Sequence, residues 1–249
     1  MLNTLTTNGT LSSARLWEKL APLVDVLAVS IDGTPTEHDL LRNCEGAFAR
    51  TVRNLENLRA VGLGFGFIFT LTQYNVDSLA FVVRLASEHG AQSVQVHPLT
   101  LHGRATKSLL GSRPDGIELT AAIAEAVRLG SELGVRVHVD ALLVDQLTAH
   151  AHAVIPTRPV LELTAVAPVL IVEASARVLP LTHELAPHFS LGTLRDGRLS
   201  ELAPQWLASG VADTLAELCE TTHRELTATP DAMAYYWYDE VAARSRRAD

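Results

Sequence analysis

The stretch FGFIFTLTQYNVDSLAFVVRLASEHGAQSVQVHP, residues 65–98, decides the fold class. Its two ends, 65–71 and 93–98, are short apolar runs, and the segment between them, 78–89, has the apolar spacing of an amphipathic helix. This helical segment follows an aspartate, a favoured N-cap, and stops at a glycine, a favoured C-cap. Two strands joined by one helix predict parallel neighbours, because a parallel pair needs a long crossover.

The same alternation continues on both sides of this unit. Further strands are predicted at 2–6, 26–31 and 135–139, and further helices at 13–23, 47–61 and 120–133. Five strands are too few for the closed barrel of eight strand–helix units. We therefore predict an α/β fold, a partial TIM-like barrel over residues 1–155.

The pattern changes after residue 155. Strand-like runs at 160–163, 169–172 and 177–181 follow one another without long helices, and helices are predicted within 199–226 and 231–247. This order predicts a small antiparallel and helical extension over residues 156–249.

Composition excludes several classes of protein. The net charge of -8, with no basic cluster before the last few residues, argues against nucleic-acid binding. The longest apolar run, residues 166–172, is too short to span a membrane. The two cysteines, Cys44 and Cys219, form no CxxC pair, which argues against a disulfide scaffold or a structural zinc site and fits a reducing cytoplasm.

Polar residues follow the predicted strands at the edge where parallel barrels carry their active sites. They include Thr7, Asn8, Ser30, Asp32, Thr70, Thr72, Asn75, His97, His138 and Asp140. Taken singly, the Asn8-Gly9 and Asp32-Gly33 pairs are better explained as tight turns.

In order along the chain, four segments resemble the later strands of radical S-adenosylmethionine enzymes, especially peptide-modifying members with a SPASM-type extension. They are TTNGT at 6–10, VSIDGTPTEHDLLR at 29–42, FTLTQYN at 69–75 and VQVHPLTLHGRA at 94–105. The resemblance is strongest from about residue 2 to residue 104 and weaker to about residue 206. SIDG followed by HDLLR is its most specific element.

The resemblance implies a set of cofactor contacts. Ser30 and Arg42, twelve residues apart, would hold the methionine end of S-adenosylmethionine. A guanidinium suits this task because it pairs with a carboxylate through two hydrogen bonds. The strand end from His97 to Leu99 would contact the adenine. The other strand-end candidates for cofactor binding are Thr7, Asn8, Asp32 and Thr70. The resemblance also allows Asp140 to handle protons in the substrate pocket, and capping of a loop by Asp140 is at least as good an explanation.

The same resemblance implies iron–sulfur chemistry that these residues do not supply. The family holds a 4Fe–4S cluster with a CxxxCxxC loop after its first strand, whereas this sequence begins at what resembles the third strand and has two distant cysteines. VEASARVLPLTHELAPHFSLGTLRDGRLSEL at 172–202 resembles the start of the SPASM-type extension, with Leu181 where a cluster ligand is expected. We therefore expect a truncated or degenerate relative, without auxiliary clusters, that once modified a peptide or another small substrate.

Two other functions stay open at this point. A partial barrel would expose strand 2–6 as a sheet edge, so the chain could be a non-catalytic partner that binds a peptide or an active paralogue, or one that a companion protein covers. A metal-dependent barrel hydrolase using Asp32, His97, His138 and Asp140 is a weaker alternative, because scattered histidines reach strand ends by chance.

Overall fold

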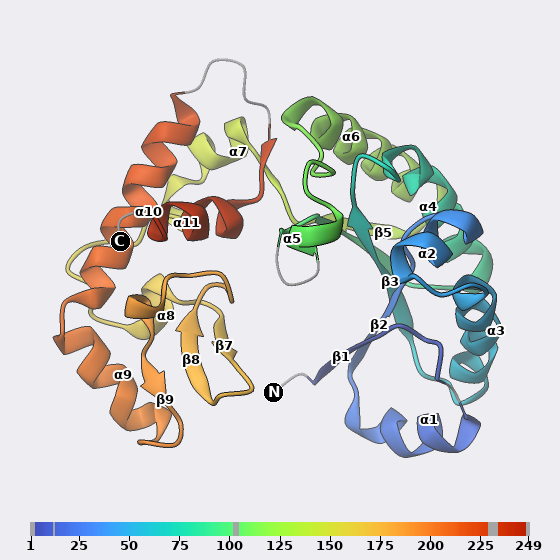
Figure 1. The fold of residues 1–249 in the computed structure, drawn as a ribbon, viewed down its shortest axis with the longest axis horizontal. Helices are drawn as coiled ribbons and strands as arrows, with labels where there is room; N and C mark the ends of the chain where they lie inside the picture. The colour runs from blue at the N-terminus through green and yellow to red at the C-terminus, as the bar shows by residue number, and fades with distance from the viewer. Residues whose placement is uncertain (1–2, 12, 102–104, 229–233, 248–249) are drawn as a thin grey trace. The chain divides into compact units, whose positions relative to one another are not determined.

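The computed structural model describes residues 3–11, 13–101, 105–228 and 234–247 (Figure 1). The chain forms two compact units, residues 1–140 and 141–249, called here the N-terminal and the C-terminal unit. The domain limits expected from the sequence, 1–155 and 156–249, stay a prediction. No helix among the described residues combines the length and the apolar character needed to cross a bilayer.

The N-terminal unit is built on a five-stranded sheet in the order β1-β2-β3-β4-β5. Its strands are β1 (Thr4–Thr7), β2 (Val26–Ser30), β3 (Phe65–Leu71), β4 (Ser93–Pro98) and β5 (Arg136–Val139). Every neighbouring pair is parallel, with registers such as Val29 to Phe67 and Phe67 to Val94. The predicted α/β fold with an incomplete parallel barrel is confirmed.

Helices connect these strands and cover the sheet on one side (Figure 1). They are α1 (Ala14–Leu20), η1 (Ala21–Leu23), α2 (Pro35–Arg42), α3 (Ala47–Ala60), η2 (Val76–Ser78), α4 (Leu79–His89) and α6 (Gly116–Leu133), whereas the short helix α5 (Ala105–Ser108) is drawn on the other side of the sheet in Figure 1. Helix α2 is missing from the sequence-based prediction, although Pro35 at its first turn and the Thr34–Glu37 capping box are helix-start signals.

Alternation along the central strands separates an apolar face from a more polar one. In β3, Phe65, Phe67 and Phe69 are buried, while Thr70 is only half-buried. In β4, the valines are buried and the intervening Gln95 and His97 are half-buried. Because successive strand residues point to opposite faces, the phenylalanines and valines form the core, and Thr70, Gln95 and His97 lie on the other face.

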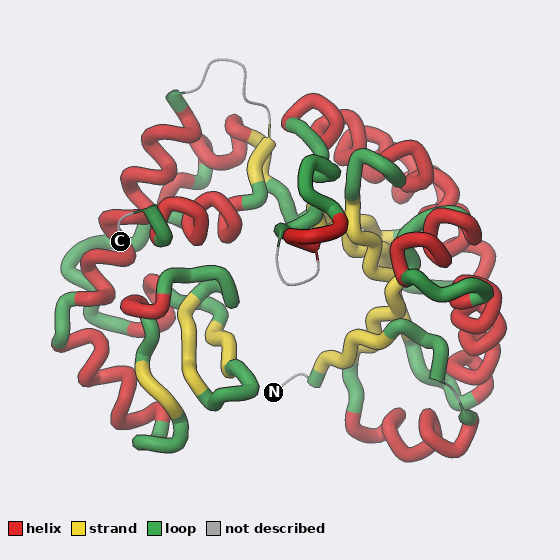
Figure 2. The backbone as a smooth tube through the Cα atoms, in the orientation of Figure 1, coloured by secondary structure: helices red, strands yellow, loops and turns green. Residues whose placement is uncertain are grey.

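The C-terminal unit contains short strands separated by loops (Figure 2), with helices beside them. Its elements are β6 (Leu142–Leu143), α7 (Val144–Ala149), η3 (Ala151–Ala153), α8 (Leu163–Val166), β7 (Leu170–Val172), β8 (Arg177–Pro180), η4 (Pro187–Phe189), β9 (Gly192–Thr193), α9 (Leu199–Ala208), α10 (Val211–Thr227), β10 (Ala234–Tyr235) and α11 (Trp237–Ser245). Strands β7, β8 and β9 pair antiparallel, as do β6 and β10. Buried Trp206 anchors the core, and its indole N–H donates to the carbonyl of Phe189 at 3.1 Å.

Two elements of this unit differ from the sequence-based prediction. Residues 160–163 were predicted to be a strand, but Val160 donates its N–H to the carboxylate of Asp213 at 2.8 Å, and the chain then enters α8. The last helix begins at Trp237 and not near residue 231, because Ala234 and Tyr235 pair with β6.

A buried amide joins the ends of β2 and β3 in the N-terminal unit. The Oδ1 atom of Asn75 accepts hydrogen bonds from the backbone N–H and the hydroxyl of Thr72, at 2.7 and 2.9 Å. Its Nδ2 atom donates to the carbonyls of Asp32, at 3.0 Å, and Thr70, at 2.8 Å. Asn75 is fully buried and uses both ends of its amide, so it fixes the two loops against each other.

The substitution Asn75→Asp is expected to destabilise the N-terminal unit. A carboxylate cannot donate to the two carbonyls, so two buried acceptors would lose their partner, at a cost of about 2–4 kcal/mol. Urea unfolding followed by circular dichroism measures the loss. Asn8→Asp is the matched control, because the Asn8 side chain is exposed and acts there as an acceptor from Thr10. Equal unfolding midpoints for the two variants would contradict this role of Asn75.

Candidate functional site

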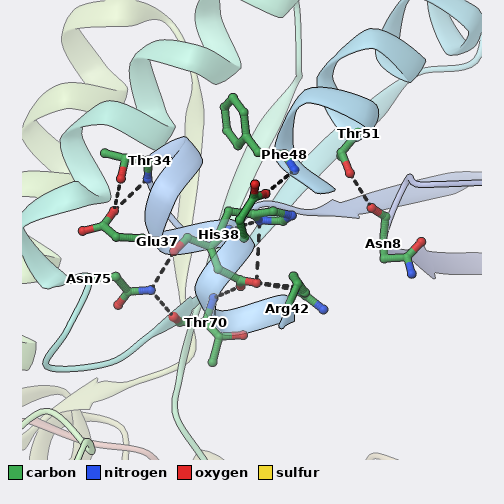
Figure 3. Close-up of polar contacts among 11 residues, drawn as sticks. Asn8, Thr34, Glu37, His38, Arg42, Phe48, Thr51, Thr70 and Asn75 are labelled. Atoms are coloured by element: carbon green, nitrogen blue, oxygen red, sulfur yellow. Dashed lines mark hydrogen bonds and ion pairs between the residues drawn. The ribbon is translucent and has the colours of Figure 1, made fainter. Parts of the chain in front are cut away.

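The candidate site centres on the carboxylate of Asp32, two residues after the end of β2; its partners Arg42 and Thr70 are labelled in Figure 3. Asp32 is 3% exposed. Its Oδ2 atom accepts from Nε of Arg42 at 2.6 Å and from Nη2 of the same guanidinium at 2.5 Å. Its Oδ1 atom accepts from the backbone N–H of Thr70 at 3.3 Å. One carboxylate therefore connects the end of β2, strand β3 and the last turn of α2.

The turn after Asp32 directs the chain into α2. Gly33 has a φ of +129°, and a Cβ there would lie 2.5 Å from Oε2 of Glu37, so this position favours glycine. The Glu37 carboxylate accepts from the N–H and the hydroxyl of Thr34 and from the hydroxyl of Ser78. Burial raises the pKa of Glu37, but the hydrogen bonds from Ser78 and Thr34 outweigh burial and hold it below its ordinary value.

His38 lies beneath Asp32 and is fully buried. Its Nδ1 atom accepts the backbone N–H of Asp32 at 3.1 Å, which requires an unprotonated Nδ1 and places the ring proton on Nε2. Burial lowers the pKa of His38. The charges of Asp32 and Asp39 raise it and that of Arg42 lowers it, so that the net pKa lies below its ordinary value. His38 is therefore neutral at physiological pH.

Ser30 is the last residue of β2 and lies two residues before Asp32. It is 8% exposed, and its hydroxyl has no hydrogen-bond partner among the described residues. The side chain of Arg42 is 33% exposed even though it is paired with Asp32. The site thus offers an unengaged hydroxyl near the strand end and a guanidinium that a ligand can reach.

A second group of polar residues lies at the ends of β4 and β5. Nδ1 of His97 is 2.9 Å from Oδ2 of Asp140, and the same oxygen accepts from Nε2 of Gln95 at 2.8 Å. The side chains of His97 and Asp140 are 29% and 30% exposed. Thr70 pairs with His97 in the β3–β4 register and donates to Asp32, so it lies between the two groups.

The remaining candidates have local contacts. Thr7 accepts the N–H of Gly9, and Asn8 accepts the N–H and hydroxyl of Thr10, as expected for turn residues. The carbonyl of Asn8 also accepts from Thr51 of α3 at 2.8 Å (Figure 3). Leu99 is buried and donates its N–H to the carbonyl of Leu71, which continues the pairing of β3 and β4.

Sequence reasoning gave no role to His38, Gln95 or Asn75. Gln95 had a usable signal, because it stands two residues before His97 and so faces the same side of β4. Asn75 follows a strand end, but the sequence does not show that its amide is buried. The acceptor role of His38 depends on how α2 packs beneath Asp32, which no local pattern reveals.

The described residues do not gather a metal site. No group of three or more His, Cys, Asp or Glu side chains among them is arranged to hold an ion. Asp32 pairs with Arg42, and Asp140 with His97. The four residues of the alternative hydrolase therefore do not form a shared cation site in the described part of the chain.

The cysteines do not fit an iron–sulfur cluster either. Cys44 is exposed, and its Sγ atom accepts from the guanidinium of Arg50 at 2.9 Å. Cys219 lies in the core of the C-terminal unit, where burial raises its pKa to about 12. A four-iron cluster needs several thiolates at one place, so neither residue provides a cluster site.

Comparison with known proteins gives relatives for part of the chain. No family model matches. The chain is 40% identical over 106 residues to the AdoMet-dependent heme synthase of Methanosarcina barkeri, covering 42% of this chain and 30% of the relative. It is 30% identical over 128 residues to the PqqA peptide cyclase of Ruegeria pomeroyi, covering 50% of this chain and 34% of the relative. The matched stretches therefore span about a third of these curated relatives.

Solved structures share the fold at low sequence identity. Native anSMEcpe with bound AdoMet and the Cp18Cys peptide superposes with a TM-score of 0.63 at 16% identity, covering 99% of this chain and 74% of that one. Streptococcus suis SuiB bound to S-adenosylmethionine gives a TM-score of 0.50 at 13% identity, covering 71% and 41%. The sequence relatives, over part of the chain, and the shared fold together point to the radical S-adenosylmethionine superfamily.

Proposed function

We propose that this chain provides the part of a radical S-adenosylmethionine protein that binds the methionine end of the cofactor, in a protein that modifies a peptide or another small substrate. The observation that carries the proposal is the Arg42 guanidinium, held by buried Asp32, which lies two residues after Ser30 and its unengaged hydroxyl. The names of the relatives, which include a peptide cyclase and a heme synthase, support this class of function.

Arg42 has the donors that such a ligand requires. A guanidinium carries five N–H groups, and Asp32 engages only the Nε and Nη2 atoms. The remaining donors can pair with the carboxylate of the ligand while Asp32 fixes the plane of the group. Ser30 would support the polar end of the ligand through its hydroxyl.

The other candidates take roles by position. Thr70 and the strand end from His97 to Leu99 would line the adenine side of the ligand. Thr7 and Asn8 would line the site at the end of β1, next to β2. His97 and Asp140, which share a hydrogen bond of 2.9 Å, form a pair suited to receiving and holding a substrate proton. Bound S-adenosylmethionine would supply the radical chemistry, and the residues described here bind and orient it.

The cluster that this chemistry requires would have to come from residues other than Cys44 and Cys219. We therefore propose that this chain is a truncated or cluster-free relative. It either acts together with another polypeptide or keeps only the binding of a peptide or companion protein. Among the described residues, strand β1 pairs in the sheet with β2 alone, and it is the edge that such a partner would cover. The two free cysteines fit a reducing cytoplasm as its location.

The substitution Arg42→Ala is expected to weaken binding of S-adenosylmethionine by about tenfold or more, because charge-assisted hydrogen bonds to the ligand carboxylate are lost. Arg42→Lys should fall between Arg42→Ala and the unaltered chain, since it keeps the charge without the planar fork. Isothermal titration calorimetry measures the affinities. Arg53→Ala, an exposed arginine of α3, is the control. Unchanged affinity in Arg42→Ala would contradict the assignment.

Anaerobic reconstitution with iron and sulfide is expected to load far less than one 4Fe–4S cluster per chain, because the chain has only two cysteines, in different units, and one of them is buried. Iron and sulfide analysis, with electron paramagnetic resonance of the reduced sample, measures the content. Cys44→Ser is the control for iron bound adventitiously at the exposed thiol. One intact cluster per chain would refute the proposal that cluster ligands must come from elsewhere.

The genomic sequence upstream of Met1 separates the two forms of the proposal. A truncated relative predicts an in-frame CxxxCxxC within the preceding two strand–helix units, or about one hundred codons at some thirty or more residues each. A cluster-free relative predicts a promoter or stop codon there. Transcript mapping decides between them.

A further inference from the structure

We propose that His38 is a positioning residue: its Nδ1 atom holds the backbone of Asp32, and through Asp32 it sets the orientation in which Arg42 meets a ligand carboxylate. This inference rests on the proposed function for the ligand. The effect of His38 on the orientation of Arg42, through Asp32, can be tested without any ligand.

The backbone of Asp32 is held at both of its polar groups. Its N–H donates to Nδ1 of His38 at 3.1 Å, and its carbonyl accepts from Nδ2 of Asn75 at 3.0 Å. Both partner side chains are fully buried. With N–H and carbonyl fixed, the side chain of Asp32 leaves the backbone in one direction, toward Arg42 and the N–H of Thr70 (Figure 3).

The chemistry of the His38 ring shows which of its atoms matters. Nε2 is buried and has no hydrogen-bond partner among the described residues. The ring also packs edge-on against Phe48, with centroids 5.9 Å apart and planes at 72°. An unpaired buried N–H such as that of Nε2 is costly, and an apolar side chain would make the contact with Phe48 without that cost. The property that only the imidazole supplies here is the acceptor Nδ1.

His38 also differs from Asn75 in what it can control. Asn75 bonds to Thr70 and Thr72 as well as to Asp32, so its loss would disturb the β3 loop as a whole. Among the described residues, the one side-chain hydrogen bond of His38 goes to Asp32. Removing the acceptor at His38 therefore releases Asp32 while the bonds from Asn75 remain.

Three variants of helix α2 test the inference. His38→Phe keeps a ring but has no acceptor, and His38→Asn places an oxygen where Nδ1 stood. Leu40→Ala is the matched control, because Leu40 is exposed on the same helix. His38→Leu replaces His38→Phe if the larger ring prevents folding, which circular dichroism reports.

The first readout uses the free protein. In ¹⁵N-edited spectra, the Nε–H signal of Arg42 reports the bond to Asp32. We expect His38→Phe to shift this signal and speed its hydrogen exchange about tenfold or more, whereas His38→Asn and Leu40→Ala stay close to the unaltered chain. An Arg42 signal unchanged by His38→Phe would overturn the inference, because His38 would then only pack.

The second readout is the affinity for S-adenosylmethionine. We expect about tenfold weaker binding in His38→Phe and recovery to within about threefold in His38→Asn. Equal weakening in both variants would overturn the inference, because it would reflect altered packing and not a lost acceptor. If no variant binds, the unaltered chain included, while the Arg42 signal still responds to His38→Phe, the proposed ligand is wrong and the positioning of Arg42 is upheld.

Discussion

The ion pair between buried Asp32 and the partly exposed Arg42 is the interaction on which the rest of the site depends. A carboxylate that is 3% exposed is stable only with a well-placed partner and with its remaining lone pairs satisfied. Here one oxygen receives the guanidinium at 2.6 Å and the other receives an N–H from β3. Such a pair tolerates little displacement, and the backbone of Asp32 is held by hydrogen bonds to the buried side chains of His38 and Asn75.

That loop also connects the parts of the N-terminal unit. Glu37 caps α2 and reaches Ser78 just before α4, Asn75 joins β2 to β3, and Asp39 accepts the N–H groups that open α3. The hydrogen bond from the N–H of Phe48 lowers the pKa of Asp39, burial raises it, and the hydrogen bond from the N–H of Gly46 lowers it. The net result is a pKa below its ordinary value. Helices that cover the apolar side of the sheet are therefore fixed, through polar contacts, to the strand ends that carry the candidate site.

The sequence predicted most of the fold and only part of this network. Strands 65–71 and 93–98 were predicted with their observed limits, because each is an apolar run between clear turn or cap residues. Ser30 and Arg42 could be selected from the spacing of a familiar motif. The residues that hold them could not, since the tasks of His38 and Asn75 follow from burial between elements far apart in sequence. The same reason explains the missing strand at 160–163, where Asp213, more than fifty residues away, takes the Val160 N–H.

The two cysteines give the chain a built-in site for labelling. Cys44 is exposed at the end of α2, one residue beyond Asn43, whose left-handed backbone closes the helix. Cys219 is enclosed in another core with its pKa raised to about 12, so it stays a thiol when Cys44 reacts. A thiol-directed fluorophore or spin label would therefore attach at one place without mutagenesis, two residues from Arg42 and just beyond the helix whose orientation decides how the guanidinium is presented.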